Sequence, residues 1–437
     1  MRSGIRVAVA CCLAAFPGCS RAERPPDIVI LLADDLGWAD VGYHGSDASG
    51  TIRTPHIDAL AAGGLRLERY RTAALCTPAR AGFLTGRSPL RFGLLKNIDQ
   101  ADAGSLPLAE ELLPSAFARK GYATAMIGKW HLGHSRKEQW PNARGFERFY
   151  GFHGGWIDYQ KHERNGVADW WRDTEPVSEA GYSTQLFADE AVKMLAEKGR
   201  ERPLLLYVAF NAPHAPVQVP PGRTVVGGTP EDAMRKTYAV MVGELDDAVG
   251  KILGAIEKGP RARETIVFFA SDNGADTRYG GSNAPLRDGK RSAFDGGIRS
   301  PAVISWPGHV TAGASEILVT HLDALATLAG LAGVTLEPAR PLDGKNVWPE
   351  LERGTPGAHE PVAFGCESGE ERRYALVGER WKLVETVSAA GSAPTDALFD
   401  IDADPGETRD VSAAAGDQIS VLRAKLQPWT SMATVPR

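Results

Sequence analysis

The sequence predicts an α/β protein with a large, mainly parallel sheet covered by helices on both faces, followed by a small C-terminal α+β domain with an antiparallel sheet. Continuous apolar runs of strand length alternate with helix-length segments as far as residue 335, which is typical of a parallel sheet. These runs lack the alternation of half-exposed strands, so we expect both faces to be buried. We predict a leader at 1–25, a first domain at 26–335 and a small second domain at 336–437.

The first elements follow from apolar runs and helix-start signals. Residues 27–33 form an apolar run that ends in turn residues, as expected of a buried strand. A helix opens at Thr54-Pro55 and extends to Leu65, and Pro78 fits the first turn of another helix. A short helix at 108–118 precedes a strand at 122–127.

The rest of the first domain repeats this alternation. Residues 184–198 have an apolar helix face, and 203–210 form a buried strand. Apolar residues spaced three and four apart predict a long helix from Met234 to Ile256. A buried strand at 265–270, the segment 301–306 and a helix at 318–332 complete the domain.

The second domain follows a turn-rich connection at 338–344. Residues 373–387 and 396–401 have the pattern of short antiparallel strands. A polar turn at 402–410 then leads to a last helix at 417–427.

The first 25 residues have the pattern of a secretory leader. Two arginines precede the apolar run 7–16, which is too short to span a bilayer. We therefore expect an exported protein, periplasmic, outer-membrane-associated or secreted in a bacterium. Gly18-Cys19 also resembles a lipoprotein cleavage site, where acylated Cys19 would be a lipid anchor. An uncleaved, buried N-terminal helix is the alternative.

Composition excludes several classes of protein. The chain has 437 residues and a formal charge of −5, with 49 basic and 54 acidic residues, so it has no overall field for nucleic acid or a membrane. An anionic ligand must be held by locally placed cations. Three of the five cysteines lie in the leader, which leaves Cys76 and Cys366 in the body. This is not a disulfide scaffold, although a Cys76–Cys366 bridge is an alternative.

Polar residues cluster just past the carboxyl ends of four predicted strands, at 34–35, 129–131, 214 and 272–273. Ligand sites in α/β sheets lie at that edge, so these clusters are expected to share one site. Four of the residues are hard oxygen donors that suit calcium or magnesium better than zinc: Asp34, Asp35, Asp272 and Asn273. Each pair alone is equally typical of a turn or a helix cap.

Cationic and titratable residues accompany these donors. Cys76 at a helix start, with Arg80 on the next turn, is expected to have a lowered thiol pKa and to favour an anion; the alternative is an ordinary half-buried cysteine. Lys129 and His131 can face one side of an extended segment, and His214 lies between two prolines. The alternative for each histidine is a structural side chain.

The segment from Cys76 to Arg87 resembles the signature of the sulfatase family, with Cys-Thr-Pro-Ala-Arg followed by Leu-Thr-Gly-Arg. The resemblance implies that a formylglycine-generating enzyme reads Thr77, Pro78 and Arg80 and oxidises Cys76 to formylglycine. It also implies one Ca²⁺, ligated by the four oxygen donors and by residue 76. Lys290 lies in a second segment that resembles the family, where Asp295 stands in place of the usual Glu; without the resemblance, Lys290 would be a solvated lysine.

The resemblance implies a two-step reaction. One hydroxyl of the hydrated formylglycine, activated by the metal and Arg80, attacks sulfur, while His214, aided by Lys290, gives a proton to the leaving alcohol. His131 then takes the proton of the second hydroxyl, so that sulfate is expelled and the aldehyde returns. Lys129, Lys290, Arg80 and the metal stabilise charge on the sulfonyl oxygens.

The resemblance covers nearly the whole mature chain and is similar to the arylsulfatase B, or N-acetylgalactosamine-4-sulfatase, type. The segments that carry it are 54–60, 128–138, 145–147 and 158–164. It implies a sulfated carbohydrate or aryl sulfate as substrate. The alternatives are a phosphomonoester or phosphonate-monoester hydrolase and a carbohydrate-binding protein without catalysis. Four aromatic residues either stack on sugars or pack their loop: Trp156, Tyr159, Trp170 and Trp171.

Overall fold

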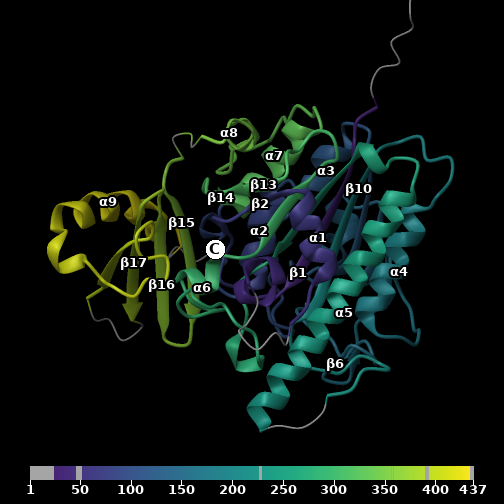
Figure 1. Ribbon diagram of the computed structural model, residues 1–437, viewed down its shortest axis with the longest axis horizontal. Helices are drawn as coiled ribbons and strands as arrows, with labels where there is room; N and C mark the ends of the chain where they lie inside the picture. The colour runs from purple at the N-terminus through teal and green to yellow at the C-terminus, as the bar shows by residue number, and fades with distance from the viewer. Residues whose placement is uncertain are drawn as a thin grey trace, which may run out of the picture.

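The computed structural model describes residues 24–45, 52–225, 229–355, 357, 359–388 and 393–433 (Figure 1). The leader, including Cys19, lies outside the described residues apart from its last two positions, so the predictions of export and of a lipid anchor remain predictions. No helix in the described ranges is both long enough and apolar enough to cross a membrane.

The core of the fold is a ten-stranded sheet in the order β13-β2-β12-β11-β1-β10-β4-β5-β8-β9. Five neighbouring strands in its centre are parallel: β11 (Thr265–Ser271), β1 (Asp27–Asp34), β10 (Leu204–Pro213), β4 (Ala123–Lys129) and β5 (Arg148–Phe152). β12 (Ala302–Ser305) pairs antiparallel with β11, and β2 (Leu65–Leu67) and β13 (Gly313–Ser315) follow it. At the other end lie β8 (Trp171–Arg172) and β9 (Glu175–Pro176). The predicted mainly parallel sheet is confirmed.

Helices cover both faces of this sheet, as predicted (Figure 1). Alternate residues of β1 point to opposite faces, so Ile28, Ile30 and Leu32 join one core cluster and Val29 and Leu31 the other. The first cluster contains residues of α2 (Cys76–Thr85), α3 (Leu113–Ala118) and α7 (Ala324–Leu331). The second contains residues of α1 (Pro55–Gly63), α4 (Ser183–Leu195) and α5 (Pro230–Lys258). Each fully buried Val, Leu or Ile contributes roughly 1.5–3 kcal/mol of transfer free energy.

A four-stranded antiparallel sheet, called here the C-terminal sheet, lies beside this core (Figure 1). Its strands are β15 (Val362–Ser368), β16 (Glu371–Val377), β17 (Trp381–Ser388) and β18 (Thr395–Asp400). One side packs on Leu75 and Phe294 of the main domain, and the other on α9 (Gly416–Ala433). The sheet therefore contacts the residue that precedes Cys76.

Three predicted elements differ from the structure. The helix predicted at 108–118 begins only at Leu113, because Pro114 lacks an N–H and is tolerated only in the first helical turn. The helix predicted at 318–332 begins at Ala324, after the short strand β14 (Val319–Thr320), which pairs with β3 (Tyr70–Arg71). The single range predicted at 373–387 contains two strands, β16 and β17, joined by a turn. Strands β5 and β15 were not predicted.

Buried ion pairs join the C-terminal sheet to α6 (Asp295–Ile298). Lys382 Nζ lies 2.7 Å from both Asp295 Oδ1 and Glu407 Oε1, and Asp295 also pairs with Arg71 at 2.7 Å. All four side chains are fully buried. Burial would raise the pKa of Asp295, but Arg71 and Lys382 outweigh it and hold that pKa well below its ordinary value. Asp295 is therefore a charged link between the two parts of the chain.

Replacing Lys382 with Met should destabilise the protein, because it leaves Glu407 as a buried charge without its cation. We expect a loss of about 3–5 kcal/mol in the free energy of unfolding, measured by chemical denaturation. The matched control is Lys425→Met, which breaks an exposed pair with Glu360 and should cost at most about 1 kcal/mol. Equal losses in the two variants would contradict a structural role for the buried pairs.

Candidate active site

The predicted site residues converge at one edge of the sheet. Asp34 and Lys129 are the last residues of β1 and β4, and His214 and Asp272 directly follow β10 and β11. These four strands are adjacent in the order β11-β1-β10-β4 and parallel, so their carboxyl ends lie side by side. The prediction that four separate polar clusters share one site is confirmed.

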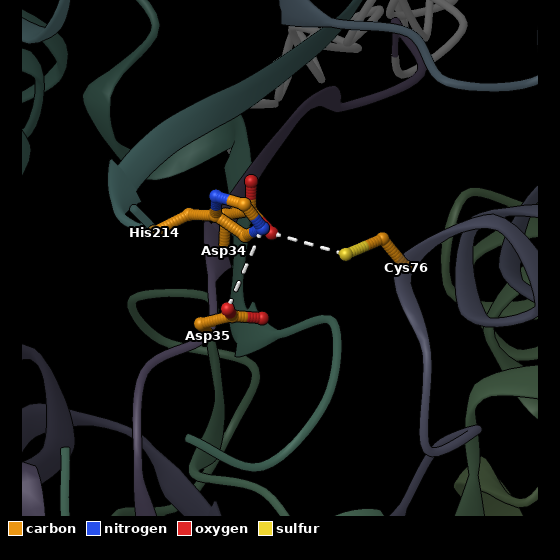
Figure 2. Close-up of side chains that lie close together, drawn as sticks. All are labelled: Asp34, Asp35, Cys76 and His214. Carbon is orange, nitrogen blue, oxygen red and sulfur yellow. Dashed lines mark hydrogen bonds and ion pairs between the residues drawn. The ribbon is translucent and has the colours of Figure 1, made fainter. Parts of the chain in front are cut away.

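Cys76 faces these strand ends from the first residue of α2 (Figure 2). Its side chain is fully buried, and Sγ lies 3.4 Å from Asp34 Oδ1 and 3.2 Å from Lys290 Nζ. Burial raises the pKa of the thiol, but Lys129 and Lys290 outweigh it and lower that pKa to about 6. Cys76 and Cys366 are both free, so the alternative of a bridge between them is excluded.

Two of the buried carboxylates are paired with cations from other elements. Lys129 Nζ donates to Asp34 Oδ2 at 2.7 Å. Arg80, on α2, places its Nε 3.0 Å and its Nη2 2.9 Å from Asp272 Oδ2, and its Nη1 donates to the carbonyl of Lys129 at 2.8 Å. The guanidinium group thus ties α2 to the ends of β4 and β11.

The third carboxylate, Asp35, has a left-handed backbone with φ 63°, a conformation that non-glycine residues adopt mainly at functional sites. Lys290 Nζ donates to its two oxygens at 2.6 and 2.8 Å, and Asn273 Nδ2 donates at 2.6 Å. Burial would raise the pKa of Asp35, but Lys290 and His214 outweigh it and lower that pKa far below its ordinary value. Asp35 is therefore ionised.

The two histidines occupy different positions. His214 Nε2 lies 3.6 Å from Asp35 Oδ2 (Figure 2). Burial and Lys290 lower the pKa of His214, but Asp35 and Asp34 outweigh them, and the resulting pKa is above its ordinary value.

His131 hydrogen-bonds through Nε2 to the carbonyl of Ile98 at 3.1 Å, while its buried Nδ1 has no partner. Burial and the neighbouring Lys129 hold its pKa well below the ordinary value, so the ring is neutral. The predicted extended segment from Lys129 to His131 is wrong, because His131 has φ 62° and the chain turns there. The two side chains consequently make different contacts.

The residue types and their spacing fit a hard cation. Ligand atoms of Asp34, Asp35, Cys76 and His214 all lie within 4.8 Å of one another. The buried Oδ1 of Asn273 has no hydrogen-bond partner and is free to bind a cation. Asp272 lies at the same edge, but it is not in that group of four, and one of its oxygens is held by Arg80. The five predicted metal ligands are thus neighbours, and His214 lies among them.

Hydroxyl groups that sequence reasoning did not identify hold the site's backbone. Thr72 Oγ1 donates to the carbonyl of Asp272 at 2.7 Å, and Ser271 Oγ donates to that of Asn273 at 2.9 Å. Thr77 Oγ1 donates to the carbonyl of His131 at 3.0 Å. Serine and threonine are common in turns, so the sequence carries no signal that distinguishes these three.

A cleft with a volume of about 530 Å³ opens onto the buried cluster. Its lining includes both site histidines, together with Trp156, Arg164 and Arg291. Ligand pockets are typically 300–1,000 Å³, so the cleft has room for a small-molecule substrate whose reacting group reaches the cations behind the histidines. Of the four aromatic residues noted in the sequence, Trp156 lines this cleft, whereas Tyr159 and Trp170 are core residues.

Comparisons with known proteins agree on the family. The sulfatase family model matches residues 26–334. The chain is 38% identical over 364 residues to N-acetylgalactosamine-6-sulfatase of Homo sapiens (77% of this chain, 68% of the relative) and 32% identical over 450 residues to arylsulfatase A of Homo sapiens (92% and 87%). The solved structure of Ps i-CgsB in complex with k-i-k-neocarrahexaose matches with a TM-score of 0.84 and 30% identity over 94% of each chain. The chain therefore belongs to the sulfatase family of sulfuric ester hydrolases.

Proposed function

We propose that this protein hydrolyses a sulfate monoester of a sulfated sugar, with formylglycine derived from Cys76 as nucleophile and one Ca²⁺ as cofactor. The observation that carries the proposal is the position of Cys76. It is buried at a helix start, 3.4 Å from Asp34 and 3.2 Å from Lys290, within the motif read by a formylglycine-generating enzyme in relatives.

A sulfated sugar is supported by two relatives. One is named N-acetylgalactosamine-6-sulfatase, and the other was solved with a carrahexaose. The cleft beside His131 and His214 is large enough for a sugar. The position of the scissile sulfate, including the 4-sulfatase type expected from the sequence, remains a prediction.

The cations of the site bind the sulfonyl group. Arg80, Lys129 and Lys290 are fully buried, and charges in a water-excluded site stabilise developing negative charge far better than in water. Their positions are fixed by carboxylates before substrate enters, so little reorganisation is needed. Arg80 also holds α2, and hence residue 76, against the strand ends.

The two histidines move protons in opposite directions. The raised pKa of His214 keeps its imidazole protonated near neutral pH, which suits donation to the leaving alcohol. The lowered pKa of His131 keeps its Nδ1 free to accept a proton during release of sulfate. Lys290 assists His214 by holding Asp35.

The donor set fits Ca²⁺ held by Asp34, Asp35, Asp272, Asn273 and residue 76. All but residue 76 supply oxygen atoms, the ligands that Ca²⁺ prefers. The ion would supply positive charge that favours an anionic substrate and an ionised nucleophile. It would also offset the repulsion among the carboxylates.

The remaining assignments extend this proposal. Residues 26–335 form the catalytic domain and 336–437 a small C-terminal subdomain. The protein is exported from a bacterial cell, and it carries a lipid anchor only if Cys19 is acylated.

The proposed function predicts both a modification and a substrate preference. In protein made with the maturation enzyme, the peptide containing Cys76 should be about 18 Da lighter than its cysteine form by mass spectrometry. This material should hydrolyse 4-nitrophenyl sulfate faster than the phosphate and phosphonate esters. Cys76→Ala should abolish turnover, whereas Cys366→Ala should retain it. Faster phosphonate turnover would overturn the sulfatase assignment, and unmodified, inactive protein would favour the binding protein.

Removal of Ca²⁺ should lower both activity and thermal stability. Restoring it at 100 times its Kd should add about 2.7 kcal/mol to the free energy of unfolding, measured as a rise in Tm. Asp35→Asn should lose most of this rise. Asp247→Asn changes an exposed acid in a second group with His56 and Asp246 and should keep it. Loss of the rise in the Asp247 variant alone would place the ion elsewhere.

His214→Ala should slow hydrolysis of a sugar sulfate far more than hydrolysis of 4-nitrophenyl sulfate. A sugar alkoxide leaves only with a proton, whereas 4-nitrophenolate needs little help, so kcat for the sugar should fall by roughly 10²–10⁴. The control is His309→Ala, an exposed histidine stacked on Trp306. Equal slowing of the two substrates by His214→Ala would show that His214 is not the proton donor.

A further inference from the structure

One arginine in the cleft has no compensating hydrogen bond. Arg164, on the short strand β6 (Glu163–Arg164), lines the cleft, and its side chain is only 11% exposed. No hydrogen bond joins it to another residue in the described part of the chain, and its buried Nε has no partner. Its one ion pair there is with Asp99 at 3.7 Å, and the Asp99 side chain is 76% exposed. This contact is too long to satisfy the guanidinium group.

The other arginine of the cleft differs. Arg291 Nη1 lies 2.6 Å from Asp276 Oδ2, and Arg278 also pairs with Asp276, at 2.8 Å. Arg291 therefore has a fixed carboxylate partner, and Arg164 does not. A buried guanidinium without hydrogen bonds is unfavourable unless a ligand completes its contacts.

Trp156 lies beside Arg164 in the same cleft. The Arg164 guanidinium carbon is 5.2 Å from the centre of the Trp156 ring, and no other ring contacts Trp156 among the described residues. A cation over one face of an indole fixes both side chains. The pair thus presents an aromatic surface and a cation together, a combination that suits an anionic sugar.

The position of this pair relates it to the leaving group. His214 and His131 line the same cleft, and His214 is the proposed proton donor to the leaving alcohol. The sugar released in the reaction therefore lies in the cleft, with its sulfate directed to the buried cations. Arg164 is outside that buried cluster and meets another part of the same molecule.

We propose that Arg164 and Trp156 form a subsite for a second anionic group, a sulfate or a carboxylate, on the leaving sugar or the sugar next to it. The subsite rests on the proposed function, because it assumes that a sulfated sugar occupies the cleft. It makes the protein selective for sugars with at least two anionic groups. The planar, five-donor guanidinium of Arg164 matches either group in a bidentate contact.

Binding to a variant without the nucleophile tests the subsite independently of turnover. We would measure calorimetric Kd values for Cys76→Ala with N-acetylgalactosamine 4-sulfate, the 6-sulfate, the 4,6-disulfate, and a disaccharide of a uronic acid with each monosulfate. The disulfate or a uronate disaccharide should bind about 10- to 100-fold more tightly than the better monosulfate. The tighter of the two identifies sulfate or carboxylate as the second group.

Arg164→Gln in the same background should abolish this preference, and Arg164→Lys should reduce it, because lysine keeps the charge but not the planar fork. Arg148→Gln is the matched control, since Arg148 is 45% exposed at the amino end of β5 and pairs with Glu197. It should keep the preference. Tm should not fall in Arg164→Gln, because no hydrogen bond to a described residue is lost.

The outcomes separate the subsite from the proposed function. Hydrolysis of 4-nitrophenyl sulfate without any preference for a second anionic group would overturn the subsite and leave the function intact. A preference that depends on Arg164 in a protein that turns over no sulfate ester would support the subsite and overturn the function. A preference that survives in both Arg164 variants would also overturn the subsite.

Discussion

Compensation of buried negative charge is the constraint on which this structure depends. Asp34, Asp35 and Asp272 are almost fully buried at adjacent strand ends, and an unpaired carboxylate there would cost several kcal/mol. Each one has a cationic partner within 3 Å. The partners come from β4, from α2 and from the loop before α6. The carboxylates therefore require that these separate segments meet at one place.

The same requirement gives the C-terminal sheet a role in the site. The loop that carries Lys290 ends in Asp295, which is held by Lys382 of β17 and whose N–H donates to Glu407 at 2.6 Å. Cys366 of β15 contacts the carbonyl of Arg291 at 3.6 Å. Contacts with the C-terminal sheet thus fix both ends of the loop. An ionic cluster of this kind is rarely the most stable way to fill a core, so its presence is better explained by chemistry than by stability.

Sequence reasoning reached the convergence of the site because parallel strands carry their polar ends to one edge. Asp34, Lys129, His214 and Asp272 each follow a continuous apolar run, and that pattern alone placed them together. It could not give the turn at His131, because φ 62° reflects tertiary contacts and no local preference of histidine. Strand β5 was missed because its sequence, Arg-Phe-Tyr-Gly-Phe, is short and contains a glycine.

The missing partner of Arg164 was also invisible in the sequence, since it is a property of the folded environment and not of the residue. Within the buried cluster every cation is matched by a carboxylate, so these side chains are already held in place before substrate binds. In the cleft, Arg291 has such a partner and Arg164 does not. Balanced charge suits groups that must stay fixed during the reaction, whereas an unmatched cation suits a group that gains its partner from the substrate. Chemistry and recognition are thereby separated along one path, from the strand ends outward to Trp156.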